Sequence, residues 1–178
     1  MITGLIEDGG KEYLIQKDGF DKTCRLCAFY NCLIDLGLVS LQYAEKRVEE
    51  LSNNFDSNLN LIDKNLYPES SIKNKSIKYS EMPKLAEIEK GIKMEKKEFE
   101  NIKGLELILA DIDEKGGNLI INYSGHASMI REYNPAAKIA IVIDSTSAQK
   151  IKYTVSQLFH QIKDLDEKNS FFYLVRKK

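Results

Sequence analysis

A cysteine-rich apolar segment at residues 24–37 constrains the fold more than any other stretch of the chain. It reads CRLCAFYNCLIDLG, and its large apolar side chains recur at spacings of three and four residues: Leu26, Phe29, Tyr30, Leu33 and Ile34. This spacing predicts a helix that is buried in the core. Thr23 or Asp21 can cap its first turn with a side-chain oxygen, and Gly37 can end it.

The composition is that of an ordinary globular protein. The 178 residues are 43% hydrophobic and 30% charged, and 26 basic side chains balance 27 acidic ones. We therefore expect one core and a single domain over residues 1–178, with neither intrinsic disorder nor general nucleic-acid binding. No run reaches the ~18 apolar residues of a membrane span, and the N-terminus lacks the basic start and apolar region of a secretory signal.

The first half of the chain is predicted to be mainly helical around the cysteine segment. A brief strand is expected at residues 11–16. Ser40 can cap an amphipathic helix over residues 41–51, because apolar positions there recur on one face. The polar residues 53–80 indicate a long connection, and connections of this length are often functional.

The second half changes from a helical to an extended pattern. Helices are predicted over residues 81–99 and 100–115, and the glycine pair 116–117 ends the second one. Further along, the pattern predicts three strands, a late helix and a last strand: residues 118–123, 126–133, 138–143, 155–165 and 170–175. Helices followed by an antiparallel sheet indicate an α+β fold.

The cysteine segment also carries candidate nucleophiles. A thiol attacks an amide carbon as the thiolate, and a helix start lowers the thiol pKa because its free N–H groups favour negative charge. This favours Cys24 weakly over Cys27, which lies one turn further in. An imidazole and a group that orients it are also needed. His126 and Asp144 can supply them from neighbouring strands, although each alone is compatible with a structural role.

Other roles of the cysteines and histidines are less well supported. Cys24 and Cys27 form a Cys-x-x-Cys pair, which also occurs in zinc and thioredoxin-type sites. The chain has no second pair, and only His126 and His160 remain as nitrogen ligands, so we expect no metal and no cofactor. Three cysteines so close together do not suggest a disulfide framework. Cys32 is expected to be an apolar core residue, and His160 a solvated or partly buried one.

Two stretches of the sequence resemble papain-like cysteine hydrolases. The pattern CxxCAxxxCxxxLG over residues 24–37 is similar to that around the catalytic cysteine of the OspI-type effector glutamine deamidases. The segments YSGHA at 123–127 and KIAIVID at 138–144 are similar to the histidine and aspartate strands of those enzymes. More loosely, the same stretches resemble bacteriocin-processing peptidases, which also place a glycine thirteen residues after the cysteine, and Josephin-type deubiquitinases.

The resemblance implies a set of roles for individual residues. In the deamidase register the nucleophile is Cys24, whereas a Josephin or papain register selects Cys27. His126 would act as acid and base, and Asp144 would orient it. Gln16, eight residues before Cys24, is a possible oxyanion-hole residue at a longer spacing than is common. The nucleophile-bearing helix would be central and would pack on the C-terminal antiparallel sheet.

The function implied by the resemblance is protein-glutamine deamidation by a bacterial effector. Its partner would be a host protein, with ubiquitin signalling as the implied setting. Such an effector resides in the bacterial cytoplasm and is then delivered into the host cytoplasm by a specialised secretion system. Two alternatives stay open: a papain-like peptidase or deubiquitinase, and a non-catalytic binding protein that keeps the fold. Oligomeric state is not indicated by the sequence.

Overall fold

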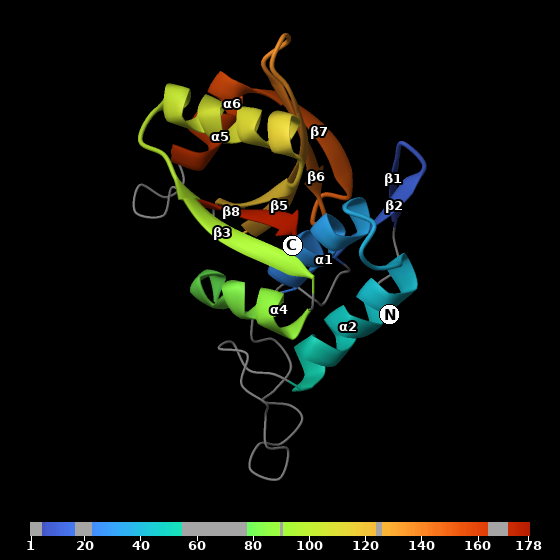
Figure 1. Ribbon diagram of the computed structural model, residues 1–178. Helices are drawn as coiled ribbons and strands as arrows, with labels where there is room; N and C mark the ends of the chain where they lie inside the picture. Colours follow the sequence, from blue (N-terminus) through green and yellow to red (C-terminus); the bar gives the residue numbers. More distant parts are fainter. Residues whose placement is uncertain (1–4, 17–22, 55–77, 90, 124–125, 164–170) are drawn as a thin grey trace.

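The centre of the molecule is a six-stranded antiparallel sheet with helices on both faces (Figure 1). The computed structural model describes residues 5–16, 23–54, 78–89, 91–123, 126–163 and 171–178. In spatial order the strands are β3 (Ile92–Glu98), β8 (Phe171–Lys177), β4 (Asn118–Tyr123), β5 (His126–Asn134), β6 (Ile139–Asp144) and β7 (Gln149–Thr154). A separate antiparallel hairpin consists of β1 (Leu5–Asp8) and β2 (Lys11–Leu14). The predicted α+β class and antiparallel meander are confirmed.

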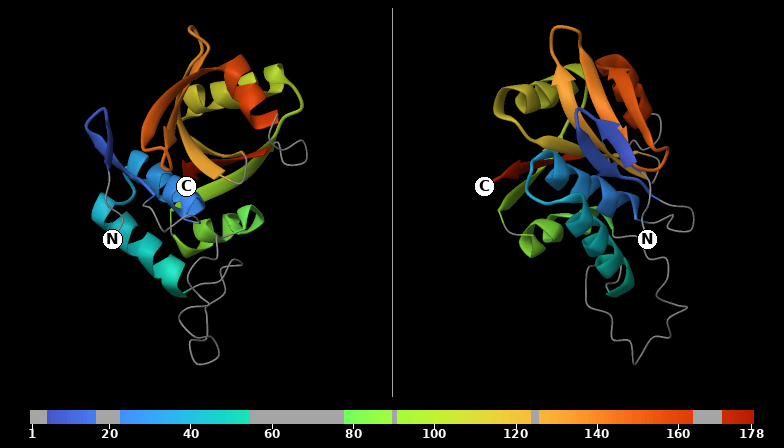
Figure 2. Two further views of the ribbon diagram at one scale, coloured as in Figure 1. Left: turned by 180° about the vertical axis from the view of Figure 1, so that it is seen from behind. Right: turned by 90° about the vertical axis from the view of Figure 1, so that its right-hand side faces the viewer.

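Helices lie on both faces of the sheet (Figure 2), and each face has its own hydrophobic core. One face packs against α1 (Cys24–Asp35), with α2 (Leu41–Asn54), the short 3₁₀ helix η1 (Tyr79–Glu81) and α4 (Pro83–Ile88) on the same side. The other face is covered by α5 (Ile102–Lys115) and α6 (Val155–Lys163). Strand β4 shows the alternation that this requires: Ile120 joins the α1 core, whereas Leu119 and Ile121 join the α5 core. Among the described residues, no helix is both long and apolar enough to cross a membrane.

Helix α1 is the buried helix that the sequence predicts. Ten of its twelve residues are buried. Gly37 follows its end with φ +66°, and the Gly37 N–H donates to the carbonyl of Ile34. The expected Thr23 cap is wrong: the side chain makes no capping bond because the backbone (ψ 0°) is not extended as a cap requires, and only the carbonyl accepts, from the Cys27 N–H. Asp21 lies outside the described residues.

The predicted helix over residues 81–99 is wrong in its second half. Helix α4 occupies Pro83–Ile88, but Gly91 (φ +86°) follows it, and Ile92–Glu98 forms the edge strand β3. Pairing with β8 along the whole of β3 outweighs the helix preference of its lysines and glutamates. Strands β1 and β7 were also absent from the prediction.

The remaining predicted elements agree with the structure where it describes them. The Ser40 hydroxyl accepts from the Tyr43 N–H at the start of α2, and Gly116 (φ +71°) closes α5. Strands β2, β4, β5, β6 and β8 and helix α6 lie close to their predicted positions. Most of the predicted connection, residues 55–77, lies outside the described residues.

The carboxylate of Asp35 ties the end of α1 to three strands. It accepts from the Tyr13 hydroxyl at 2.6 Å, the Asn118 amide at 3.0 Å and the Arg131 guanidinium at 3.1 Å, and it pairs with Lys11 at 3.2 Å. Burial raises the pKa of Asp35, but the hydrogen bonds from Tyr13, Asn118 and Lys11 and the charge of Lys11 lower it by more. The net pKa is therefore below the ordinary value. This network fixes α1 against β2, β4 and β5.

We expect Asp35→Ala to lower the free energy of unfolding by about 3 kcal/mol, because it removes the carboxylate that Tyr13, Asn118 and Arg131 share as an acceptor. The contribution of Asp35 should be complete above about pH 5 and disappear as the pH falls through about 4 toward its lower folded pKa. Urea unfolding at several pH values measures both effects. Asp113→Ala, an exposed carboxylate on α5, is the control. Equal urea midpoints for Asp35→Ala and the wild type would contradict the prediction.

Candidate active site

Cys24 is the first residue of α1, and its thiol lies against the start of β5. The side chain is only 3% exposed. It is hydrogen-bonded to the imidazole of His126, and the backbone N–H of Ala127 donates to the sulfur. Both neighbours follow from the packing of α1 on β5. The free N–H groups at the start of the helix add a favourable potential for a thiolate.

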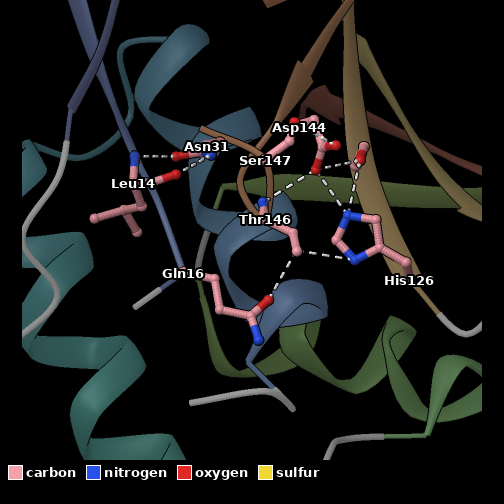
Figure 3. Close-up of polar contacts among 8 residues, drawn as sticks. Leu14, Gln16, Asn31, His126, Asp144, Thr146 and Ser147 are labelled. Carbon is pink, nitrogen blue, oxygen red and sulfur yellow. Dashed lines mark hydrogen bonds and ion pairs between the residues drawn. The ribbon is translucent and has the colours of Figure 1, made fainter. Parts of the chain in front are cut away.

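His126 and Asp144 lie side by side at one end of the sheet (Figure 3). His126 begins β5, and Asp144 ends the antiparallel neighbour β6. The imidazole Nε2 and the Asp144 Oδ1 are 2.7 Å apart. Since an ionised carboxylate only accepts, Nε2 carries the proton in this bond, and Nδ1 is the nitrogen left to exchange a proton with a thiol.

Hydrogen bonds hold the Asp144 carboxylate on several sides. The Thr146 N–H donates to Oδ1 at 3.0 Å, the Ser147 hydroxyl to Oδ2 at 2.8 Å, and the buried Ser128 hydroxyl to Oδ1 at 3.3 Å. Ser128 also lies 3.4 Å from Nε2 of His126. These donors compensate the burial of Asp144 and fix its orientation.

The three groups shift one another's pKa values in a consistent direction. Burial raises the pKa of Asp144, but the His126 and Ser147 hydrogen bonds lower it to about 2. Burial lowers the pKa of His126, but the bonds to Asp144 and Cys24 raise it to about 9. Burial raises the pKa of Cys24, yet the bonds from His126 and from the Ala127 N–H bring it below its ordinary value. The arrangement therefore favours a thiolate beside an imidazolium.

The other two cysteines have a different environment. Cys27 and Cys32 are fully buried, and both are free thiols. Burial raises the pKa of Cys27 to about 12, although its thiol lies 4.0 Å from the Thr23 hydroxyl. Burial raises the pKa of Cys32 well above its ordinary value. Of the two candidate nucleophiles, Cys24 is the one whose thiol is bonded to His126. His160 is exposed on α6, as expected.

Gln16 reaches the site through β2 and through a bridging threonine. The amide of Asn31 on α1 bonds both backbone groups of Leu14 (2.7 and 3.0 Å), and two residues later the Gln16 N–H donates to the Ser145 carbonyl at 2.7 Å. The Thr146 hydroxyl then lies 2.9 Å from the Gln16 Oε1 and 3.0 Å from the His126 Nδ1 (Figure 3). The Thr146 hydroxyl thus bridges the side chain of Gln16, which the sequence singled out, and that of His126.

Sequence reasoning missed Asn31, Ser128, Thr146 and Ser147. The segment DSTS after β6 indicates a polar turn, and this was the available signal for the last two. Polar turns are common, however, and nothing local links this one to Gln16, which lies 130 residues away.

Comparisons with known proteins add little to this geometry. No protein-family model and no curated protein matches the sequence. Among solved structures, the chain is similar to the N-terminal peptidase C39-like domain of a toxin secretion ATP-binding protein from Vibrio parahaemolyticus. The identity is 18% and the TM-score 0.48, over 92% of this chain and 99% of that one. A likeness this loose carries no argument, so the interpretation of the site rests on its own geometry.

We expect iodoacetamide to alkylate Cys24 selectively in the folded protein at neutral pH, because its pKa is lowered while those of Cys27 and Cys32 are raised. The rate constant should rise as the pH climbs through the Cys24 pKa and then level off. His126→Ala should move this rise to higher pH. Peptide mapping by mass spectrometry locates the alkylated residue.

Cys27→Ala is the matched control for this experiment and should retain the alkylation of the wild type. If Cys27 rather than Cys24 were alkylated in the folded wild type, the assignment of the reactive thiol would be wrong.

Proposed function

We propose that this protein is a cysteine-dependent amide hydrolase with Cys24 as nucleophile, His126 as acid and base, and Asp144 as the residue that orients His126. The observation that supports it best is the continuous hydrogen-bonded series from Asp144 through His126 to Cys24, at the N-terminus of a buried helix. Nucleophilic catalysis requires this order of groups, and each one shifts the pKa of the next in the direction that the chemistry needs.

The proposed reaction has two steps. The Cys24 thiolate attacks a carboxamide carbon and forms a C–S bond; the C–N bond then breaks as His126 gives its Nδ1 proton to the leaving nitrogen. Water next attacks the thioester while His126 takes its proton. The C–S bond then breaks, which releases a carboxylic acid and restores the Cys24 thiolate beside protonated His126. The backbone N–H of Cys24 and the side chain of Gln16 are the proposed donors to the oxyanion.

We propose deamidation of a protein glutamine as the specific reaction. The spacing of residues 24–37 supports it by resemblance, and so does the depth of the thiol. Cys24 is 3% exposed. A glutamine carboxamide stands at the end of a side chain and can enter a narrow opening, whereas a backbone amide continues in both directions and needs an open groove. Delivery into a host cell and a substrate in ubiquitin signalling belong to the same proposal.

Peptide or isopeptide cleavage is the second candidate. It is favoured by one observation, the glycine thirteen residues after Cys24, which is also the spacing in bacteriocin-processing peptidases. The two reactions share every step and differ in the leaving group, which is ammonia in one and an amine in the other. The products therefore distinguish them.

We expect the protein to convert a glutamine to glutamate when it is incubated with short glutamine-containing peptides and with purified ubiquitin-pathway proteins. Intact-mass measurement should show the small gain of an amide-to-acid change without fragments, and an enzymatic assay should detect an equal amount of ammonia. Cys24→Ala should lose at least about a thousandfold in rate, because the nucleophile is gone. Cys27→Ala should stay active.

The alternative outcomes are distinct. If the substrate were cut into fragments and no ammonia were released, the protein would be a peptidase and not a deamidase. No product from any substrate, together with a Cys24 that iodoacetamide does not alkylate at neutral pH, would contradict amide hydrolysis and favour a binding protein.

A further inference from the structure

Thr146 has a position that the reaction described above does not explain. It is exposed in the turn between β6 and β7, and its hydroxyl lies between the side chains of Gln16 and His126. The hydroxyl oxygen is 2.9 Å from the Gln16 Oε1 and 3.0 Å from the His126 Nδ1. Its own backbone N–H donates to the Asp144 carboxylate at 3.0 Å, which keeps the side chain in place.

Counting protons assigns a direction to each of these bonds. A hydroxyl has one proton to donate, and the Gln16 Oε1 can only accept, so the Thr146 proton points to Gln16. Thr146 then offers only a lone pair to the His126 Nδ1, which must itself carry a proton. The Nε2 of His126 is protonated as well, because it faces the Asp144 carboxylate at 2.7 Å. With this orientation of the Gln16 amide, both ring nitrogens are donors and the imidazole is a cation.

The same bond orients the side chain of Gln16. With its Oε1 held by Thr146, the amide nitrogen of Gln16 occupies the other branch of the side chain. That nitrogen is the donor that a developing oxyanion needs.

We propose that Thr146 is a positioning residue for this site. Its hydroxyl stabilises the protonated Nδ1 of His126, and by holding the Oε1 of Gln16 it leaves the amide nitrogen of Gln16 directed away from Thr146, as a donor to the oxyanion. The inference rests on the proposed function for its meaning in catalysis.

The opposite polarity makes a contrary prediction. If the Gln16 amide were rotated by half a turn, its nitrogen would donate to Thr146, and Thr146 would donate to a bare Nδ1. The hydroxyl would then stabilise a neutral imidazole, and the carbonyl of Gln16 would take the place of the oxyanion donor. A hydrogen bond favours whichever charge state it is made to, so the two polarities shift the His126 pKa in opposite directions.

The test compares Thr146→Val, which keeps the shape and removes the hydroxyl, with Thr146→Ser, which keeps the hydroxyl. The His126 pKa is measured by NMR on the folded protein; the chain has two histidines, and His160→Gln assigns the resonances. Thr146→Val should lower the His126 pKa by about 1 and reduce the Cys24 alkylation rate constant below neutral pH by about tenfold. Thr146→Ser should restore both values.

Thr154→Val is the matched control. Thr154 also donates to a glutamine, the Oε1 of Gln157 at 3.0 Å, but at the start of α6. The Thr154→Val variant should leave the His126 pKa unchanged. Circular dichroism verifies that each variant is folded before titration.

With a glutamine peptide as substrate, Thr146→Val should lower kcat rather than raise KM. The double variant Gln16→Ala/Thr146→Val should lose less than the product of the two single losses, because part of the effect of Thr146 acts through Gln16. An unchanged or raised His126 pKa in Thr146→Val would overturn the inference, and a raised value would establish the opposite polarity. If the His126 pKa is unchanged or raised in Thr146→Val while the wild type is an active hydrolase, only the role of Thr146 is refuted and the proposed function stands. A lowered pKa in a protein without hydrolase activity refutes the proposed function and retains the effect of Thr146 on His126.

Discussion

The side-chain amide of Asn31 decides where the parts of the site meet. Its oxygen and nitrogen bond the N–H and carbonyl of Leu14, a fully buried residue. An unmade bond to either backbone group would cost about 1–3 kcal/mol, so β2 has one stable position on α1. Asn31 lies two helical turns after Cys24, and Gln16 follows Leu14 by two residues. The helix that carries the thiol therefore also holds the strand that brings Gln16 to Thr146, and through Thr146 to His126.

The two ends of α1 have opposite electrostatic requirements. At the N-terminal end the helix dipole favours the negative charge of a Cys24 thiolate, and the cation of His126 adds to it. At the C-terminal end, the carboxylate of Asp35 is unfavourable to the dipole. Lys11 and Arg131 offset it, and they come from the hairpin and the sheet between which α1 lies. A charge that weakens the isolated helix thus strengthens its attachment to the fold.

Sequence alone predicted the parts of this structure that depend on local patterns. The three- and four-residue spacing in α1 and the apolar runs of β4 to β6 led to the right elements, and their order brought Cys24, His126 and Asp144 together as candidates; their catalytic roles stay predictions. Thr146 and Asn31 were missed because each acts on a segment far away in the chain. Strand β3 was missed for the same reason: it forms by pairing with β8, and its lysines and glutamates give no local indication of a strand.

Those lysines and glutamates have a further consequence at the edge of the sheet. Lys93 and Lys97 pair with Glu95 at 2.5 and 3.0 Å, and Lys96 pairs with Glu98 at 2.5 Å. A strand from another molecule that docked beside β3 would have to disturb these solvated charges. The lysines and glutamates that suggested a helix therefore make this edge of the sheet unfavourable for pairing with a strand of another molecule.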